Sequence, residues 1–447
     1  MTVNLRNEPI ISVAVMDRQP SVAGRFHGTF SGHGLTLGAG QFSARPGPGA
    51  VILSDGTGRE VARSPLIRLR AAPRSFFDLF NVTIGRQFHW ERKEEQRFLG
   101  DLVLRSREDG TVVVINEIPV ETYLESVIAS EMSASAPGEF LKVHAVLSRS
   151  WVLAALERRR GPGGESYEAP KAVGDEGEVI RWYEREDHDL FDVCADDHCQ
   201  RYQGITKISS GEAQQAVRET RGMAITYGDE VCDARYSKAC GGLTEEFQSA
   251  WGDTPVPYLV SIVDGPVPHR PVTTEAEAAR WCLSRPAAYC DMRDPTILEK
   301  VLPAFDQETE DFFRWKVEYP RGELEEIVRE KSGCDLGRLK EIVPLARGPS
   351  GRISRLRMVG SLMNVVVGKE LEIRRWLART HLYSSAFIVR VTRGPGGEAE
   401  RFAFHGAGWG HGVGLCQIGA AMMAAGGSSA EEILRHYFPR TVRERVY

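Results

Sequence analysis

Short apolar runs separated by glycine and proline breaks characterise the first quarter of the chain. Ile10–Val15 and Val51–Leu53 are apolar runs of strand length, and the segment Arg45–Gly49 (RPGPG) interrupts the pattern between them. Such runs bounded by Gly and Pro are typical of β-strands joined by tight turns. The pattern therefore predicts a β-rich region over residues 1–108.

The pattern changes from strand to helix near residue 115. Thr111–Ile115 is rich in β-branched residues and predicts a buried strand. Pro119 then fits the first position of a helix that ends near Glu131. Apolar side chains recur at helical spacing within this segment: Tyr123, Leu124, Val127 and Ile128.

A second helix is predicted from Gly138 to about Arg158. Apolar positions recur there at spacings of three and four, as on one face of a helix: Phe140, Val143, Leu147, Trp151 and Ala154. Residues 159–187 are polar and Gly-rich and predict a surface excursion. A Gly-Pro-Val-Pro segment at 265–268 is a plausible boundary between lobes.

The second half of the chain mixes both periodicities. Residues 273–340 favour helices, and residues 342–392 favour strands with a helix around Lys369–Leu377. Two overlapping capping boxes, Ser428 with Glu431 and Ser429 with Glu432, predict the start of a final helix. The whole pattern predicts a multi-lobed α+β protein with divisions at 1–108, 109–264 (including the excursion 159–187) and 265–447.

Composition excludes some classes of protein. The chain has 447 residues and a net charge of -5, with 56 basic and 61 acidic residues, so its charge gives no reason to expect nucleic acid as a partner. No stretch is long and apolar enough to predict a membrane span. The first 30 residues show no signal peptide, so either the protein stays in the cytoplasm or its export signal lies outside this sequence.

Glu131 is the candidate catalytic residue. It lies where one helix ends before Ala136-Pro137 and a second begins, so its side chain is placed to project into a cleft. Cleavage of a glycosidic bond needs a carboxylic acid that protonates the departing oxygen, and apolar neighbours would raise the pKa of such an acid. The alternative from pattern alone is a solvated glutamate at a helix end.

Two basic residues on the second helix are candidates for substrate binding. Lys142 and Arg149 are seven residues apart and share a face that is not the apolar stripe. The functional interpretation is a cationic wall of a sugar cleft. The alternative is a solvated basic edge of the helix.

The segment 188–200 is the best candidate for a metal site. Cys194 and Cys199 with one imidazole, from His188 or from His198, would suit Zn²⁺ with one open position. A Cys194–Cys199 disulfide or two buried thiols are the alternatives. The other close cysteine pairs in sequence, Cys232 with Cys240 and Cys282 with Cys290, are interpreted as buried thiols, and Cys334 is assigned no role.

A Gly-rich run near the C-terminus, residues 410–414, superficially suggests a nucleotide loop. Only 33 residues follow it, too few for the rest of a dinucleotide-binding domain. A nucleophilic pair of Cys416 and His411 is a second hypothesis, which would make the protein a peptidase or amidase. The alternative is that the glycines bring the backbone close to a sugar, while His411 and Gln417 form local hydrogen bonds.

Three blocks, in order along the chain, resemble the stage II sporulation protein D (SpoIID/LytB) family. The first is Asn116–Leu156, with Ser-Glu-Met at 130–132. The second is Tyr236–Thr244 (YSKACGGLT), followed by Trp251-Gly252 and Pro257–Leu259. The third is Gly408–Ala420 (GWGHGVGLCQIGA), followed by Glu432–Leu434 and Tyr437–Pro439. Together the blocks span roughly residues 110–447, and three blocks in order are more specific than any one of them.

The resemblance implies a lytic transglycosylase that acts on peptidoglycan glycan strands stripped of stem peptides, with Glu131 as its single acid and base. The product would carry a 1,6-anhydro-N-acetylmuramic acid end, and no water would be consumed. Within this interpretation Lys142 or Arg149 pairs with the lactyl carboxylate of the substrate. Candidate cleft residues from the other blocks are Tyr236, Ser237, Thr244, His411 and Gln417.

The resemblance also implies a structural zinc held by one His and two Cys, which corresponds to His188, Cys194 and Cys199. Family members act outside the cytoplasm, so a location in the cell envelope is expected. Part of the family enhances amidases instead of cutting glycan. A non-catalytic, peptidoglycan-binding enhancer of an N-acetylmuramoyl-L-alanine amidase is therefore the alternative function. Residues 1–108 match the family only loosely, through Ile84–Trp90.

Overall fold

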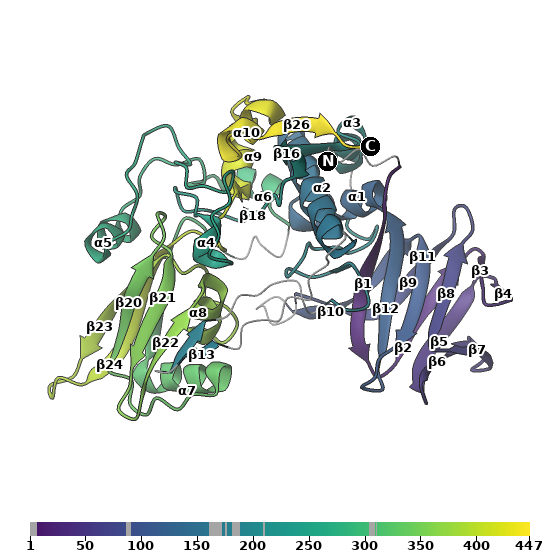
Figure 1. Ribbon diagram of the computed structural model, residues 1–447, viewed down its shortest axis with the longest axis horizontal. Helices are drawn as coiled ribbons and strands as arrows, with labels where there is room; N and C mark the ends of the chain where they lie inside the picture. The colour runs from purple at the N-terminus through teal and green to yellow at the C-terminus, as the bar shows by residue number, and fades with distance from the viewer. Residues whose placement is uncertain are drawn as a thin grey trace. The chain divides into compact units, whose positions relative to one another are not determined.

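The chain divides into two compact units (Figure 1). The first unit contains Met1–Gly164, His188–Cys232 and Arg443–Tyr447, and the second contains Glu165–Asp187 and Asp233–Val442. The computed structural model describes residues 7–85, 91–160, 172–174, 177–180, 188–208, 211–303, 309 and 311–447. Both units contain helices and sheets, so the predicted α+β fold class is confirmed.

Two sheets form the β-rich part of the first unit. A seven-stranded sheet has the order β15-β1-β12-β11-β8-β3-β4, and a six-stranded sheet has the order β10-β9-β2-β5-β6-β7. Strand β11 of one sheet contacts β6 of the other, and β12 contacts β5, so the two sheets pack against each other. Fully buried side chains such as Phe30, Leu53 and Phe77 fill this core.

Strands β2 and β8 alternate buried with more exposed positions, as a sheet with one face toward a core requires. The strand bounds are β1 Ile10–Gln19, β2 Val22–His27, β3 Phe30–Gly32, β4 Leu35–Leu37, β5 Gly40–Gly47, β6 Ala50–Asp55, β7 Glu60–Ser64, β8 Leu66–Ala71, β9 Phe76–Ile84, β10 Arg92–Leu99, β11 Asp101–Ser106, β12 Val112–Pro119 and β15 Val193–Cys194.

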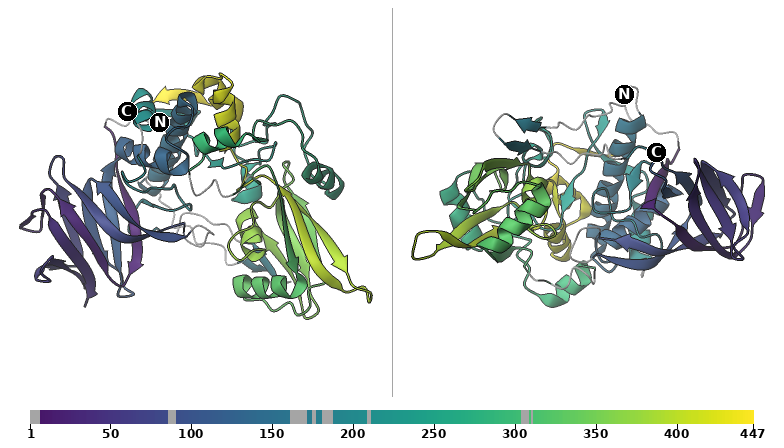
Figure 2. Two further views of the ribbon diagram at one scale, coloured as in Figure 1. Left: turned by 180° about the vertical axis from the view of Figure 1, so that it is seen from behind. Right: turned by 90° about the horizontal axis from the view of Figure 1, so that it is seen from below.

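Helices α1 (Val120–Glu131), α2 (Gly138–Arg160) and α3 (Gly211–Glu219) complete the first unit together with a small sheet. That sheet has the order β17-β16-β26, from Glu230–Val231, Met223–Tyr227 and Val442–Arg445. Helix α1 follows β12 directly and contacts β1 and β12, as Figures 1 and 2 show. The five apolar positions that predicted α2 are all buried.

Helix α1 differs from its prediction by one residue. Pro119 is the last residue of β12, with extended backbone (φ -59°, ψ 142°), and Val120 is the first helical residue. The ring of proline fixes its φ at a value that the N-cap position allows. Proline lacks a backbone N–H, but no hydrogen bond of the helix requires one at this position. The helix ends at Glu131, because Met132 returns to an extended conformation.

The second unit contains three sheets. Their strand orders are β13-β14-β22-β21-β20, β19-β24-β23 and β18-β25. The strand bounds are β13 Ala172–Gly174, β14 Glu178–Ile180, β18 Tyr236–Ser237, β19 Arg314–Pro320, β20 Glu341–Arg347, β21 Ile353–Val359, β22 Asn364–Gly368, β23 Phe387–Arg393, β24 Ala399–Ala407 and β25 Leu415–Cys416.

Short helices connect and cover these sheets, and α7 packs against β19 and β24 (Figure 2). Their bounds are α4 Phe247–Ala250, α5 Glu275–Leu283, α6 Pro295–Val301, α7 Arg321–Ser332, α8 Glu370–Trp376, α9 Gln417–Ala425 and α10 Ala430–Tyr437. A core of buried residues, including Trp315, Leu356 and Phe404, joins α7 and α8 to the two larger sheets.

Some expectations differ from the structure of the second unit. The segment 273–340 contains strand β19 as well as helices α5, α6 and α7, because β19 pairs with β24, far away in the sequence. Of the two capping boxes, Ser429 with Glu432 caps α10. Most of the excursion 159–187 lies outside the described residues. Residues 86–90 of the segment Ile84–Trp90 lie outside them completely.

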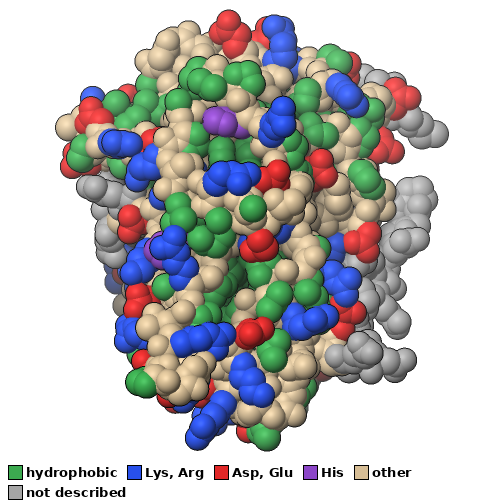
Figure 3. Space-filling view, turned by 90° about the vertical axis from the view of Figure 1, so that its left-hand side faces the viewer, with side chains coloured by type: hydrophobic (Ala, Val, Ile, Leu, Met, Phe, Trp, Pro, Cys, Tyr) green, Lys and Arg blue, Asp and Glu red, His purple; other side chains and the backbone are tan. Residues whose placement is uncertain are grey.

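The compact units divide the chain differently from the predicted boundaries at 108 and 264. Strand β12 pairs with β1 and β11, so residues 1–108 share a unit with α1 and α2. Among the described helices, none is long and apolar enough to cross a membrane. On the face drawn in Figure 3, acidic and basic side chains are interspersed, in keeping with the nearly balanced charge.

Candidate active site

Glu131 is the last residue of α1 and lies inside the first unit. It is 8% exposed, and its neighbours Ser130 and Met132 are fully buried. The backbone N–H of Arg201 donates a hydrogen bond of 2.9 Å to Oε1 of Glu131. The carboxyl group therefore lies in a shielded position and accepts a hydrogen bond from a backbone donor, and a small part of the residue is reachable from solvent.

Hydrogen bonds on both sides of Arg201 attach the segment 200–203, which supplies this donor, to α1 and α2. Oε1 of Gln200 accepts a hydrogen bond from the hydroxyl of Tyr123 at 3.0 Å, and Nε2 of Gln200 donates to the carbonyl of Ser148 at 3.3 Å. Gln203 N–H donates to Oγ of Ser126 at 3.2 Å. These contacts fix the position of the Arg201 N–H relative to the end of α1.

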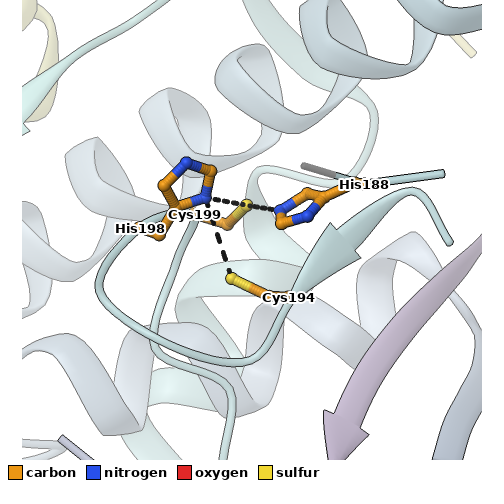
Figure 4. Close-up of side chains that lie close together, drawn as sticks. All are labelled: His188, Cys194, His198 and Cys199. Atoms are coloured by element: carbon orange, nitrogen blue, oxygen red, sulfur yellow. Dashed lines mark hydrogen bonds between the residues drawn. The ribbon is translucent and has the colours of Figure 1, made fainter. Parts of the chain in front are cut away.

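A group of four metal-binding side chains lies just before this segment. His188, Cys194, His198 and Cys199 turn toward one another (Figure 4), and their ligand atoms all lie within 4.8 Å of one another. Nε2 of His188 is 3.1 Å from Sγ of Cys199, and Nδ1 of His198 is 3.5 Å from the same sulfur. Both histidines that the sequence offered as alternatives belong to the group.

The donor set fits a tetrahedral zinc ion. Two thiols and two imidazoles are a common ligand set of structural zinc and fill all four positions. Hydrogen bonding with Cys199 lowers the pKa of the Cys194 thiol well below its ordinary value, and bonds with His188 and His198 lower it further against the effect of burial. All eight cysteines lie within the described residues, and none of them forms a disulfide.

The two basic residues of α2 have different surroundings from those expected. Arg149 is completely buried and forms a bidentate ion pair with Glu121, at 2.9 and 2.7 Å. Its Nη1 also donates to the carbonyl of Met223. Lys142 is half-buried and pairs with Glu139 at 2.9 Å and with Glu219 at 2.8 Å. Both cations therefore hold parts of the first unit together.

The remaining candidate residues belong to the second unit. Strand β18, which carries Tyr236 and Ser237, pairs in parallel with β25, which ends next to Gln417. Ser237 and Gln417 are buried, and Tyr236 is half-buried. Thr244 is completely buried, and its hydroxyl bonds to the backbone of Val260 and Ile262. This arrangement gives Thr244 a structural role in its loop.

His411 lies in a cationic and aromatic environment. The ring of His411 contacts the ring of Trp251 edge to face, and the two ring centres are 4.7 Å apart. The guanidinium of Arg235 lies 4.2 Å from the ring centre of Trp251. Nδ1 of His411 accepts a hydrogen bond from the Val413 N–H, so this nitrogen carries no proton. Burial and the charges of Arg235 and Arg352 lower the pKa of His411 well below its ordinary value.

This shift predicts how acid affects stability. Because the folded pKa of His411 lies below its unfolded value of about 6.5, the unfolded chain takes up the proton first. Neutral His411 therefore makes its full contribution to stability above about pH 6.5, the unfolded pKa. This contribution is lost as the pH falls below that value. We expect His411→Gln to make the decline of the thermal midpoint between about pH 7 and pH 5 shallower than in wild type. Equal slopes for the two proteins would contradict this prediction.

The surroundings of Cys416 differ from those of a catalytic nucleophile. Its Sγ accepts a hydrogen bond from the Cys240 N–H at 3.2 Å, and Cys240, Asp264 and Cys290 are its neighbours in a completely buried group. His411, by contrast, contacts Trp251 and its own loop. Within the described residues, the structure gives no support to a nucleophilic pair of Cys416 and His411.

Comparison with known proteins identifies the helical half of the first unit. Residues 108–227 match the family model described as "Stage II sporulation protein". The chain contains a stage II sporulation protein domain. This SpoIID domain includes Glu131, the segment 200–203 and the four-residue Cys and His group, and the resemblance read from the sequence is confirmed.

Curated relatives match over a longer range than the SpoIID domain alone. Stage II sporulation protein D of Bacillus amyloliquefaciens is 23% identical over 72% of this chain and 74% of its own length. The protein of the same name from Bacillus subtilis is 22% identical over 73% and 75%. The amidase enhancer of Bacillus subtilis is 23% identical over 52% of this chain and 32% of its own length. Residues 245–414 match a second family model, described as a domain of unknown function.

Sequence reasoning missed several residues that build the surroundings of Glu131 in the SpoIID domain. Arg201 supplies its backbone donor, Gln200 anchors the segment, and Glu121 neutralises Arg149. None of these has a distinctive spacing from Glu131, since Arg201 is 70 residues away. The nearest available signal was the position of Cys199, two residues before Arg201.

Proposed function

We propose that the protein is a lytic transglycosylase that cleaves the bond between N-acetylmuramic acid and N-acetylglucosamine in peptidoglycan glycan strands. The observation that carries the proposal is the shielded carboxyl of Glu131 at the end of α1, held by the Arg201 N–H. The SpoIID domain and its relatives support a role in the cell wall, and such a substrate implies a location outside the cytoplasm.

The reaction uses one carboxyl group in two protonation states. Glu131 donates its proton to the glycosidic oxygen as the bond to C1 of the muramic sugar breaks. The carboxylate then removes the proton from the C6 hydroxyl of the same sugar, and the C6 oxygen bonds to C1. The N–H of Arg201 supports this second state, because a fixed donor stabilises the carboxylate that forms during the reaction.

We propose that His188, Cys194, His198 and Cys199 hold a structural zinc ion. Four protein ligands leave no open position, so the ion would supply rigidity and no Lewis-acid chemistry. The group immediately precedes the segment 200–203, which positions the donor to Glu131. A single residue, Gln200, therefore separates the last proposed zinc ligand, Cys199, from Arg201, whose N–H donates to Glu131.

Removal of this metal is expected to destabilise the protein. A ligand present at about a thousand times its dissociation constant stabilises the folded state by about 4 kcal/mol, so chelation should lower the thermal midpoint by roughly 10 °C. Cys194→Ser, which alters this group alone, should also lower the thermal midpoint and should reduce glycan cleavage. Cys334→Ser, at a half-buried thiol outside the group, is the matched control. Unchanged midpoints after chelation and in Cys194→Ser would overturn the zinc proposal.

Each unit, taken by itself, contains residues that we propose as sugar ligands. Tyr236, with a half-buried ring, can stack on a pyranose face, while Ser237, His411 and Gln417 carry polar groups close to it in the chain fold. Lys142 has a partly exposed side chain, and its ammonium group would exchange Glu139 or Glu219 for a lactyl carboxylate. Arg149 and Thr244 are not among the ligands that we propose, because their polar atoms bond within the protein.

A second candidate function follows from the similarity to the amidase enhancer. In that case the protein would bind peptidoglycan and increase the activity of an N-acetylmuramoyl-L-alanine amidase without cutting glycan. The two functions separate in one experiment, in which the protein alone is incubated with peptide-free glycan strands. A transglycosylase releases 1,6-anhydro products, which mass spectrometry detects. An enhancer releases none, yet accelerates an added amidase on whole peptidoglycan.

A further inference from the structure

A second group of metal-binding side chains lies within the second unit, separate from the SpoIID domain. Cys240, Asp264, Cys290 and Cys416 are all buried, and their ligand atoms lie within 4.8 Å of one another. The four residues come from four distant parts of the sequence. Their convergence on one point therefore results from the fold and not from a local motif.

The spacing of the ligand atoms fits a tetrahedral metal better than a disulfide. Zinc–sulfur bonds of about 2.3 Å place two thiolates about 3.8 Å apart in a tetrahedral site. Sγ of Cys240 lies 3.7 Å from Sγ of Cys290 and 3.1 Å from Oδ2 of Asp264. A disulfide would bring two sulfurs to about 2.05 Å.

The hydrogen bonds around this group resemble those around the ligands of a metal site. The hydroxyl of Tyr437 donates to Oδ1 of Asp264, which leaves Oδ2 directed to the sulfurs. The N–H groups of Gly242 and Cys240 donate to the sulfurs of Cys240 and Cys416, at 3.3 and 3.2 Å. Donors directed at sulfur stabilise thiolates, which are the form that binds metals.

Close packing and local charge also favour an ion at this position. A Cβ on Gly419 would lie 2.5 Å from both Oδ1 of Asp264 and the Tyr437 hydroxyl, so the first turn of α9 approaches the carboxylate directly. Cys416 immediately precedes α9, whose N-terminus carries partial positive charge. The buried guanidinium of Arg352 donates to the carbonyl of Cys240. Both features offset the negative charge of three thiolates and a carboxylate.

We propose that Cys240, Asp264, Cys290 and Cys416 bind a zinc ion in a closed, four-coordinate structural site. The ion would join β25 and the loop after β18 to two further loops of the second unit. Strand β18 carries Ser237, and β25 is followed directly by Gln417. The zinc site would therefore fix the arrangement of these two proposed sugar ligands. The inference concerns metal content and does not depend on the proposed catalytic activity.

The test counts zinc in the full-length protein, purified without a metal-affinity step, by elemental analysis and native mass spectrometry. A Cys194→Ser/Cys199→Ser protein disables the first group and is expected to retain one zinc per chain. Adding Asp264→Asn or Cys290→Ser should remove that zinc. Adding Cys282→Ser, a buried thiol of the same unit outside the group, should leave it bound.

Several results would overturn the inference. One is a Cys194→Ser/Cys199→Ser protein that folds and holds no zinc. Another is a disulfide that links any two of Cys240, Cys290 and Cys416 in peptides mapped without reductant. If the substituted proteins do not fold, cobalt substitution of the otherwise unaltered site decides. Sulfur-to-cobalt charge transfer together with tetrahedral visible bands at two equivalents supports the site, and one equivalent contradicts it.

Discussion

Glu131→Gln is expected to lower the rate of 1,6-anhydro product formation by at least about 100-fold, because general acid–base catalysis contributes about 10²–10⁴ to a rate. The amide keeps the shape of the side chain, and its oxygen can still accept the hydrogen bond from the Arg201 N–H. What it loses is the proton that the departing sugar needs. Initial rates on peptide-free glycan strands, followed by mass spectrometry, measure the effect.

Glu125→Gln is the matched control for this experiment. Glu125 lies on the same helix, is half-buried and accepts a hydrogen bond from Gln214 at 3.0 Å. The same chemical change there should leave the rate within about twofold of wild type, because Glu125 takes no part in the proposed proton transfers. Full activity in Glu131→Gln, with the thermal midpoint unchanged, would remove the catalytic role of Glu131.

Arg149→Met is expected to reduce the free energy of unfolding by about 3–5 kcal/mol, because it leaves a buried carboxylate without its counter-ion. Arg149 is completely buried, and Glu121 also accepts hydrogen bonds from the Gly222 N–H and the Tyr447 hydroxyl. Burial alone would raise the pKa of Glu121, but the bonds and charge of Arg149 bring it below its ordinary value. Urea denaturation monitored by circular dichroism measures the change.

Arg63→Met provides the comparison for the buried pair. Arg63 and Glu60 form an exposed ion pair at 2.8 Å in the same unit. Exposed ion pairs contribute little to stability, so this variant should unfold almost as wild type does. Equal losses in the two variants would indicate that the Arg149–Glu121 pair is not a stabilising centre of the SpoIID domain. A stable Arg149→Met protein that lacked only glycan affinity would restore Arg149 as a sugar ligand.

Local periodicity was sufficient to predict the elements that carry the site. The apolar spacing that predicted α2 corresponds to buried positions along its length, and the end of α1 falls at Glu131 as expected. These features depend on neighbours within one or two helical turns, which the sequence displays directly. Strand β19 was missed because its partner β24 lies some 80 residues later.

The surroundings of individual side chains could not be predicted in the same way. Arg149 was predicted to line a sugar cleft or to lie on a solvated basic edge, because its face of α2 is polar. Glu121, 28 residues earlier, instead makes burial of that charge possible. The cysteines were grouped by closeness in sequence, as Cys232 with Cys240 and Cys282 with Cys290. The fold instead brings Cys240 to Cys290 and Cys416, which is 176 residues away. The ion pair and the cysteine group both depend on contacts between residues far apart in the sequence, which the spacing of residues along the chain does not reveal.

The origin of the oxygen at the new muramic end distinguishes a transglycosylase from a hydrolase. Peptide-free glycan strands are incubated with the full-length protein in oxygen-18 water, and the muramic ends of the products are analysed by mass spectrometry. A single carboxyl that directs the C6 hydroxyl to C1 predicts 1,6-anhydro ends that contain no labelled oxygen. Reducing ends that carry the label, or intact strands in the presence of folded protein, would contradict it.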